Sequence, residues 1–424
     1  MIDADSSNKR IIRIFFFCFA IYAVAIVCYL WLTANAGAPA QIRGSAADPA
    51  TFLTPLQLRQ SIEYSAIGNG MFLISYPWEW AIYIILLFGG AAKRWQDRWN
   101  AAPLPGILRL AGYVLTLQAA AFAAFLPLRI VGYALSRGYG ISTQSIGSWL
   151  RDKAIAFGIG YVVLLLTTAV GFWLIGRGGR WWLKLWLLSV PFTLFLMYIQ
   201  PVLIDPLYNR FSPLSDPVLE QEILQLAAQA DIPADRVYEV DMSAKTRALN
   251  AYVNGIGSSL RIVLWDTTLQ QMSRKEILLI MAHEMGHYVM HHLEWSAVGA
   301  IASSFFVLWF GSWAYIRILR RSGHRFGIAR ANDMAALPLI LLLASVIGFA
   351  TAPVANAVSR HAEQAADRFA YDLIGSTSGA VTLYQKLAAS SLSEVEPPML
   401  VRLLRSTHPS IMERILDAQT YRPR

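Results

Sequence analysis

The residues best suited to chemistry lie in one short motif, His283-Glu284-Met285-Gly286-His287, which has the pattern HExxH. Positions i and i+4 share one face of a helix, so both imidazoles can reach a single metal ion. Glu284 follows the first histidine directly and is angled to hold a metal-bound water rather than to ligate. Zinc lowers the pKa of such a water to about 7, and the carboxylate takes its proton as it attacks a carbonyl. The motif predicts one Zn²⁺ per chain and amide hydrolysis without a covalent intermediate.

The histidines are distributed too unevenly for this motif to be incidental. The chain holds 7 His in 424 residues, and all of them follow residue 282, with four between 283 and 292. With these numbers of His and Glu, chance gives about 0.003 HExxH matches per chain. The alternative, an amphipathic helix with unrelated histidines, is therefore disfavoured.

Two histidines bind zinc weakly, so a third ligand is needed while one position stays open for water. His291 continues the i, i+4 series, but it lies eight residues from His283, about 12 Å along the helix axis. A zinc ion shared by His283 and His287 cannot reach it. We expect His291 and His292 to be dispensable polar residues near the membrane surface.

A pair of carboxylates, Glu363 and Asp367, is the better source of the third ligand. They share a helix face at i, i+4. One can bind zinc while the other accepts the distal N–H of a ligand histidine and fixes its tautomer. The alternative is a solvated acidic face. The segment begins at the end of a membrane helix and is otherwise apolar, which favours ligation.

The elements that position these residues have the composition of a membrane protein. Hydrophobic residues make up 56% of the chain and charged residues only 15%, with a mean hydropathy of +0.43; soluble chains carry about 25% charged residues. The net charge of +9 comes from Lys and Arg spread between apolar stretches, which fits orientation in a bilayer better than nucleic-acid binding. The two cysteines, Cys18 and Cys28, form no CxxC, so zinc must be held by His and carboxylate.

Seven apolar stretches are long enough to cross a hydrocarbon layer as helices. They lie near 11–33, 70–91, 108–128, 154–176, 181–204, 295–318 and 334–357. The first resembles a signal peptide, but it is longer than the usual signal core of about 7–15 residues, so we expect a retained helix. Glu79, in the second stretch, either lines an internal chamber or is an interfacial carboxylate between two tryptophans.

The polar segments divide the chain into four regions. Residues 1–204 form a five-helix membrane region, and 205–294 a catalytic region that ends with the HExxH helix. Residues 295–357 hold membrane helices six and seven, and 358–424 a C-terminal catalytic region with the third ligand. The first catalytic region predicts a helix at 218–230, strands at 237–240, 249–253 and 260–265, a hairpin turn at 255–259 and a capping box at 273–276.

At these residues the sequence resembles the type I CAAX prenyl endopeptidases, integral-membrane zinc proteases of the gluzincin type. The matching segments occur in the family's order over most of the chain. They are Pro206–Leu214, Asn250-Ala251-Tyr252, Arg261–Thr267, the HEMGH motif, Ser359–Glu363 with Ala366-Asp367, and His408-Pro409-Ser410 with Arg414-Ile415. The resemblance strengthens Glu363 as third ligand and makes His408 a candidate for stabilising the oxyanion.

The resemblance also implies the fold: a mainly α, multi-pass membrane protein with seven transmembrane helices around a chamber and a split, zincin-like α+β catalytic domain. It implies substrate contacts at Asn250, Ala251 and Tyr252, on an edge strand to which an extended peptide can add, and at Arg360. The expected partners are a peptide or protein substrate, including lipidated C-termini, and the lipid bilayer. A bacterial chain would lie in the plasma or inner membrane, and a eukaryotic one in the endoplasmic reticulum membrane.

Lys and Arg placement opposes one feature that the resemblance implies, a zinc site on the cytosolic face. The N-terminus and the second, fourth and sixth loops carry 15 Lys and Arg, whereas the first and third loops carry 6. Because cytoplasmic loops are usually basic, this asymmetry predicts that the zinc site faces away from the cytoplasm.

Two other functions are compatible with part of the sequence. A zinc protease that degrades damaged membrane proteins would share every catalytic residue and differ only in substrate. A seven-span transporter or receptor would need neither the HExxH motif nor Glu363, and no internal repeat typical of transporters is present.

Overall fold

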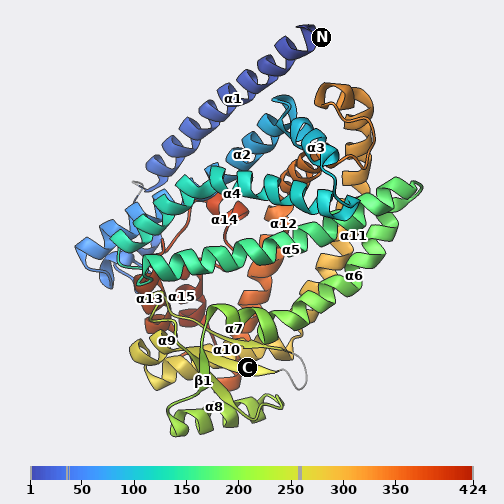
Figure 1. Ribbon diagram of the computed structural model, residues 1–424. Coiled ribbons are helices and arrows are strands. Elements are labelled where there is room, and N and C mark those ends of the chain that lie inside the picture. Colours follow the sequence, from blue (N-terminus) through green and yellow to red (C-terminus); the bar gives the residue numbers. More distant parts are fainter. Residues whose placement is uncertain (1, 35–36, 38, 256–259, 423–424) are drawn as a thin grey trace.

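Seven long helices dominate the computed structural model, which describes residues 2–422 except 35, 36, 38 and 256–259 (Figure 1). Within these residues, seven helical segments are long and apolar enough to cross a membrane. They contain α1 (Ile2–Ala34), α2 (Pro55–Phe88), α4 (Gly106–Gly138), α5 (Ile146–Arg177), α6 (Trp181–Ile199), α11 (His292–Ser322) and α12 (Leu337–Ile374). The predicted multi-pass helical architecture is confirmed.

Several of these helices extend well beyond the apolar stretch from which they were predicted. Helix α2 has 34 residues and starts at a capping box formed by Thr54 and Gln57, with Pro55 at its first position. At 1.5 Å per residue it is about 51 Å long, more than the hydrocarbon thickness of about 30 Å. Helix α12 is continuous for 38 residues despite Pro353, so one unbroken helix runs from the membrane into the catalytic region.

The first helix packs on the second as part of the membrane bundle. The Tyr22 hydroxyl donates to the Leu73 carbonyl at 3.2 Å, and the Tyr29 hydroxyl accepts from the Leu400 amide at 3.1 Å. These contacts join α1 to α2 and to the C-terminal region. Glu79 contacts α12, since it accepts from Ser345 Oγ at 2.6 Å.

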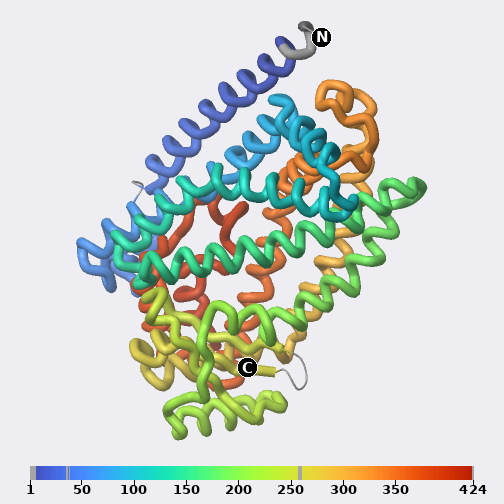
Figure 2. Tube along the Cα trace, in the orientation of Figure 1, coloured from blue at the N-terminus to red at the C-terminus, as the bar shows by residue number. Residues whose placement is uncertain are grey.

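The N-terminal end of α1, the segment that follows α2 and the connection between α11 and α12 lie at the end of the molecule remote from β1 (Figures 1 and 2), and all three contain Lys or Arg. Asn8 near the N-terminus donates from Nδ2 to the carbonyls of Phe88 and Arg325, both at 3.3 Å. These contacts join the start of α1 to the end of α2 and to the α11–α12 loop. Segments that the Lys and Arg count placed on one side are therefore neighbours in space.

The catalytic region contains a four-stranded sheet with the order β1-β2-β4-β3. Its strands are β1 (Phe211–Pro213), β2 (Val237–Val240), β3 (Ala251–Asn254) and β4 (Arg261–Trp265). The β3–β4 pair is the predicted antiparallel hairpin, with Tyr252 opposite Val263, whereas β2 and β4 are parallel. Most of the predicted hairpin turn lies outside the described residues. Strand β3 lies at the edge of the sheet, where a further strand can add.

The two catalytic segments of the sequence share one hydrophobic core. Helices α8 (Pro217–Gln229) and α10 (Arg274–Val289) pack with α13 (Ala380–Ser391) and α15 (Ile411–Thr420). Ile223, Met281 and Met285 from the first segment and Tyr384 and Ile415 from the second are all buried in this core. The membrane hairpin of α11 and α12 therefore interrupts a single folded unit, as the predicted split domain requires.

Candidate metal centre

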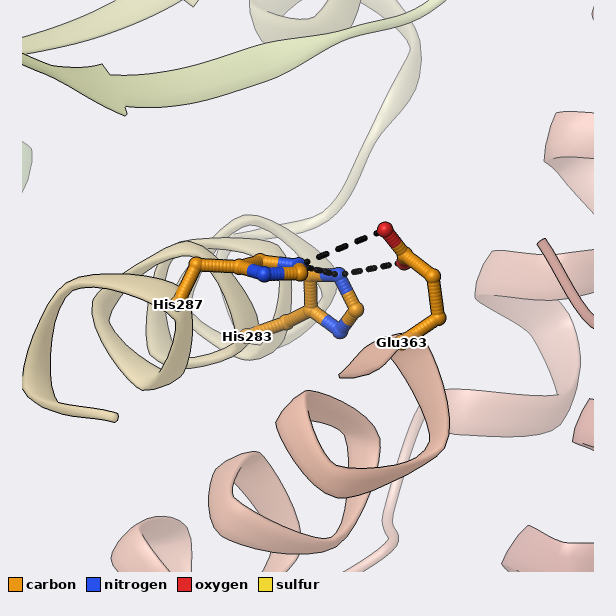
Figure 3. Close-up of side chains that lie close together, drawn as sticks. All are labelled: His283, His287 and Glu363. Carbon is orange, nitrogen blue, oxygen red and sulfur yellow. Dashed lines mark hydrogen bonds and ion pairs between the residues drawn. The ribbon is translucent and has the colours of Figure 1, made fainter. Parts of the chain in front are cut away.

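Three side chains from two helices converge on one point (Figure 3). His283 and His287 come from α10, and Glu363 comes from α12. One potential ligand atom from each lies within 4.8 Å of the others. The two Nε2 atoms are 3.1 Å apart, and Glu363 approaches His283 Nε2 at 3.2 Å and His287 Nε2 at 3.5 Å. The residues expected to bind metal are thus brought together.

Helix α10 is fixed at its start and packed closely on α12. Its cap is the predicted capping box, in which Glu276 Oε2 accepts from the Ser273 amide at 2.7 Å. Lys386 from α13 also contacts Glu276, at 2.7 Å. Gly286, inside the HExxH motif, permits the close approach of α12, because a Cβ there would lie 2.9 Å from Phe369 Cδ1. A larger residue at position 286 would push the two ligand-bearing helices apart.

Asp367 fixes the orientation and tautomer of His283. Its Oδ1 lies 2.8 Å from His283 Nδ1, a contact in which Nδ1 donates and Nε2 can bind a metal. Arg414 donates to both oxygens of Asp367, at 2.9 Å from Nε and 2.6 Å from Nη2, and Tyr384 donates at 3.2 Å. Burial opposes the charge of Arg414, but Asp367 outweighs it and raises the pKa of Arg414 above its ordinary range. Sequence reasoning found Asp367 and gave Arg414 no role, although Arg414 stands in one of the matching motifs.

His292 contacts His287, an interaction that the sequence did not predict. Its Nδ1 lies 2.9 Å from His287 Nδ1. Helix α10 ends at Val289, two residues after His287. His291 then adopts a positive φ of 55°, and the turn brings His292, the first residue of α11, back onto the ligand. His291 itself is exposed and pairs with Glu294 at 3.5 Å, away from the three converging side chains.

The chemistry of these donors fits a divalent cation. Asp367 and His292 engage Nδ1 of the two histidines, and the two Nε2 atoms face each other only 3.1 Å apart. Glu363 Oε2 is buried and makes no hydrogen bond to any described residue. A cation bound by the two Nε2 atoms and a Glu363 oxygen would satisfy all three groups at once.

Glu284 lies beside the metal-binding group without joining it. Its Oε1 is 4.0 Å from His283 Nε2, and it lines a cavity of about 270 Å³ together with His283, Asn250 and Ala251. Burial raises the pKa of Glu284, an effect that His283 and His287 oppose. A carboxylate with a raised pKa is a stronger proton acceptor, which suits a general base.

His408 lines the same cavity, next to the metal-binding group. Its Nε2 is 3.3 Å from Glu363 Oε2, and Thr407 Oγ1 lies 2.9 Å from its Nδ1. The side chain is 56% exposed and lines this cavity and a neighbouring one. Desolvation is accordingly the largest cause that lowers the pKa of His408.

The residues expected to bind substrate divide into two groups. Asn250 and Ala251 line the catalytic cavity, and Asn250 is tied to Thr268, whose Oγ1 accepts from the Asn250 amide at 2.9 Å. Tyr252 lies on β3 but is not among the described residues that line this cavity. Arg360 donates from Nη1 to the carbonyls of Arg402 and Ser406, both at 2.8 Å, and so holds the segment that leads to His408.

Comparisons with known proteins agree with this geometry. The family model of Peptidase family M48 matches residues 213–422, and that of the CAAX prenyl protease N-terminal region, with five membrane helices, matches 46–210. The metalloprotease YhfN of Bacillus subtilis is 45% identical over 403 residues, which cover 95% of this chain and 94% of that protein. A CAAX prenyl protease 1 homolog of Arabidopsis thaliana is 29% identical over 289 residues, covering 67% of this chain and 66% of that protein.

The fold has a counterpart among solved structures. The crystal structure of S. mikatae Ste24p superposes with a TM-score of 0.80, at 20% sequence identity, and the match covers 97% of this chain and 98% of that one. The membrane helices and the catalytic region are therefore arranged in the same way in the two proteins.

Proposed function

The chain belongs to peptidase family M48 and is an integral-membrane zinc metalloprotease, and on this premise we propose that His283, His287 and Glu363 hold one Zn²⁺. When bound, zinc supplies a Lewis acid and lowers the pKa of a coordinated water. The observation that carries the proposal is the approach of the two Nε2 atoms to 3.1 Å, beside a buried Glu363 oxygen that makes no hydrogen bond to any described residue.

The protein's own groups have distinct tasks in this mechanism. Glu284 takes the proton of the attacking water and passes it to the leaving amine. His408 donates from its imidazole to the oxygen of the scissile carbonyl as negative charge develops there. Asp367 and His292 hold the two ligand histidines in the tautomer that leaves Nε2 free, and Arg414 keeps Asp367 ionised.

We infer that the substrate binds as an added strand along β3. Asn250 and Ala251 belong to the same cavity as Glu284 and His408, which supports a peptide aligned by main-chain hydrogen bonds across the site. The catalytic unit comprises residues 205–294 and 358–424, a division supported by their shared core. Relatives named as CAAX prenyl proteases suggest C-terminal processing of prenylated or similar peptides.

A peptide pair tests this substrate class. The full-length protein, purified in detergent, is incubated with an S-farnesylated peptide whose cysteine is fourth from the C-terminus and with the same peptide lacking the lipid. Mass spectrometry should find cleavage next to the lipidated cysteine, faster for the farnesylated peptide, and none with Glu284→Gln. Cleavage of unfolded membrane proteins at many internal sites, with no action on the lipidated peptide, would instead indicate a quality-control protease.

A further inference from the structure

A second cavity adjoins the catalytic one and reaches the membrane helices. Its volume is about 540 Å³, within the range of ligand pockets, and its walls come from α2, α4 and the C-terminal catalytic region. The two cavities share five lining residues, Ser391, Ser393, His408, Pro409 and Ile411. A peptide that crosses the catalytic centre can therefore continue into this space.

Arg405 projects into the second cavity from the end of α14 (Met399–Leu404). Its guanidinium lies over the Phe72 ring, with Cζ 5.3 Å from the ring centroid, and Nη1 donates to Asn69 Oδ1. A guanidinium has five N–H donors, so most of them remain available. Among the described residues, no carboxylate lies within ion-pair distance of Arg405, and desolvation lowers its pKa.

The other charged side chains of this cavity are arranged differently. Arg402 is neutralised by Glu396 at 3.3 Å and Glu413 at 2.5 Å. Glu394 is the acidic residue of the lining, and burial, followed by the charge of Glu396, raises its pKa to about 7. Arg405 is thus a partly desolvated cation that lacks an anion, which is the property of an anion-binding group.

Arg405 is close to the catalytic centre along the chain. It precedes His408 by three residues, so their Cα atoms are at most about 11 Å apart. Three extended residues beyond a scissile bond span about 10 Å, a similar length. We propose that Arg405 binds the C-terminal carboxylate of the substrate and so selects peptide bonds two or three residues from a chain end. This inference rests on the proposed protease function and specifies how the site would select a peptide bond near the C-terminus of its substrate.

Binding of product-like tripeptides tests the proposal without turnover. The probes are N-acetyl Val-Ile-Met with a free carboxylate and the same peptide as a carboxamide. Their affinities are measured by thermophoresis on the full-length Glu284→Gln protein, loaded with zinc. We expect the carboxylate to bind about tenfold or more tightly than the amide, since one charge-assisted hydrogen-bonded contact is lost in the amide.

The variant series assigns the preference to one side chain. Adding Arg405→Gln should reduce the preference to within about threefold, while Arg405→Lys should keep part of it, because Lys keeps the charge but loses the planar donor set. Arg236→Gln, at an exposed arginine outside both cavities, should leave the preference unchanged. Equal binding of the two probes overturns the proposal. A preference for the carboxylate that persists in Arg405→Gln also overturns it, because that result would show that the carboxylate binds the metal instead.

Failure of this subsite and failure of the proposed substrate class give different results. A protein that ignores the farnesylated peptide but keeps the Arg405-dependent tripeptide preference refutes lipidated substrates alone. A protein that cleaves the farnesylated peptide, yet binds both tripeptides equally, refutes the carboxylate subsite alone. Zinc content and thermal unfolding of the Arg405 variants, compared with Arg236→Gln, show whether the fold is intact.

Discussion

His292→Ala should weaken zinc binding although position 292 is not a proposed ligand. The Nδ1 of His292 lies 2.9 Å from His287 Nδ1. When His287 binds zinc through Nε2, its Nδ1 carries the proton and donates it to His292 Nδ1. Removal of such an outer partner typically costs 10–100-fold in metal affinity, or about 1.4–2.8 kcal/mol. The His287 side chain is 24% exposed, so water can partly replace the lost acceptor. We therefore expect a loss near tenfold.

The assay is competition between the purified protein and a chromophoric zinc chelator, read as the zinc dissociation constant. His292→Asn should restore most of the affinity, because Asn Oδ1 is bonded to Cγ as histidine Nδ1 is and can accept the same proton. His291→Ala is the matched control, one residue away and on an exposed side chain, and should keep wild-type affinity. Its positive φ of 55° makes some loss of thermal stability expected there, without loss of zinc.

Two outcomes would refute this reasoning. If His292→Ala binds zinc as tightly as the wild type, His287 is oriented by its helix alone. If His292→Ala and His291→Ala weaken zinc equally, the effect comes from the turn between α10 and α11 rather than from the hydrogen bond.

Three further predictions concern the site and its orientation. Glu284→Gln should keep stoichiometric zinc by metal analysis but lose peptidase activity, whereas Glu363→Ala should lose zinc; full zinc and activity in Glu363→Ala would contradict the ligand set. His408→Ala should lower kcat by about 10²–10³-fold with little change in KM or zinc, the usual cost of an oxyanion donor, and an unchanged kcat would remove that role. Cysteines placed at Ser215 and Ser322 in a background without native cysteines should react with an impermeant thiol reagent on intact cells at 215 but not at 322; reaction at 322 alone would put the zinc site on the cytosolic face.

Local sequence patterns were sufficient for the helices, for much of the catalytic region and for the cluster around the HExxH motif. A long apolar stretch outside the membrane would expose apolar surface to water. Inside the membrane, a helix satisfies its own backbone hydrogen-bonding groups. The seven apolar stretches therefore predicted seven membrane-crossing helices. The HExxH spacing places His283 and His287 on one helix face, and the i, i+4 spacing of Glu363 and Asp367 does the same for the carboxylates. Within such segments periodicity alone fixes which side chains share a face.

Contacts between segments far apart in sequence were decided by the tertiary structure. The role of His292 depends on one left-handed residue, His291, that ends α10 and turns α11 back, and no helical period predicts such a turn. Arg414 reaches Asp367 across 47 residues, and Arg405 faces Asn69 across 336. Periodicity carries no information on such pairs, because it describes one element at a time. They are set by how whole helices pack, and packing depends on side-chain shape and burial over the entire chain.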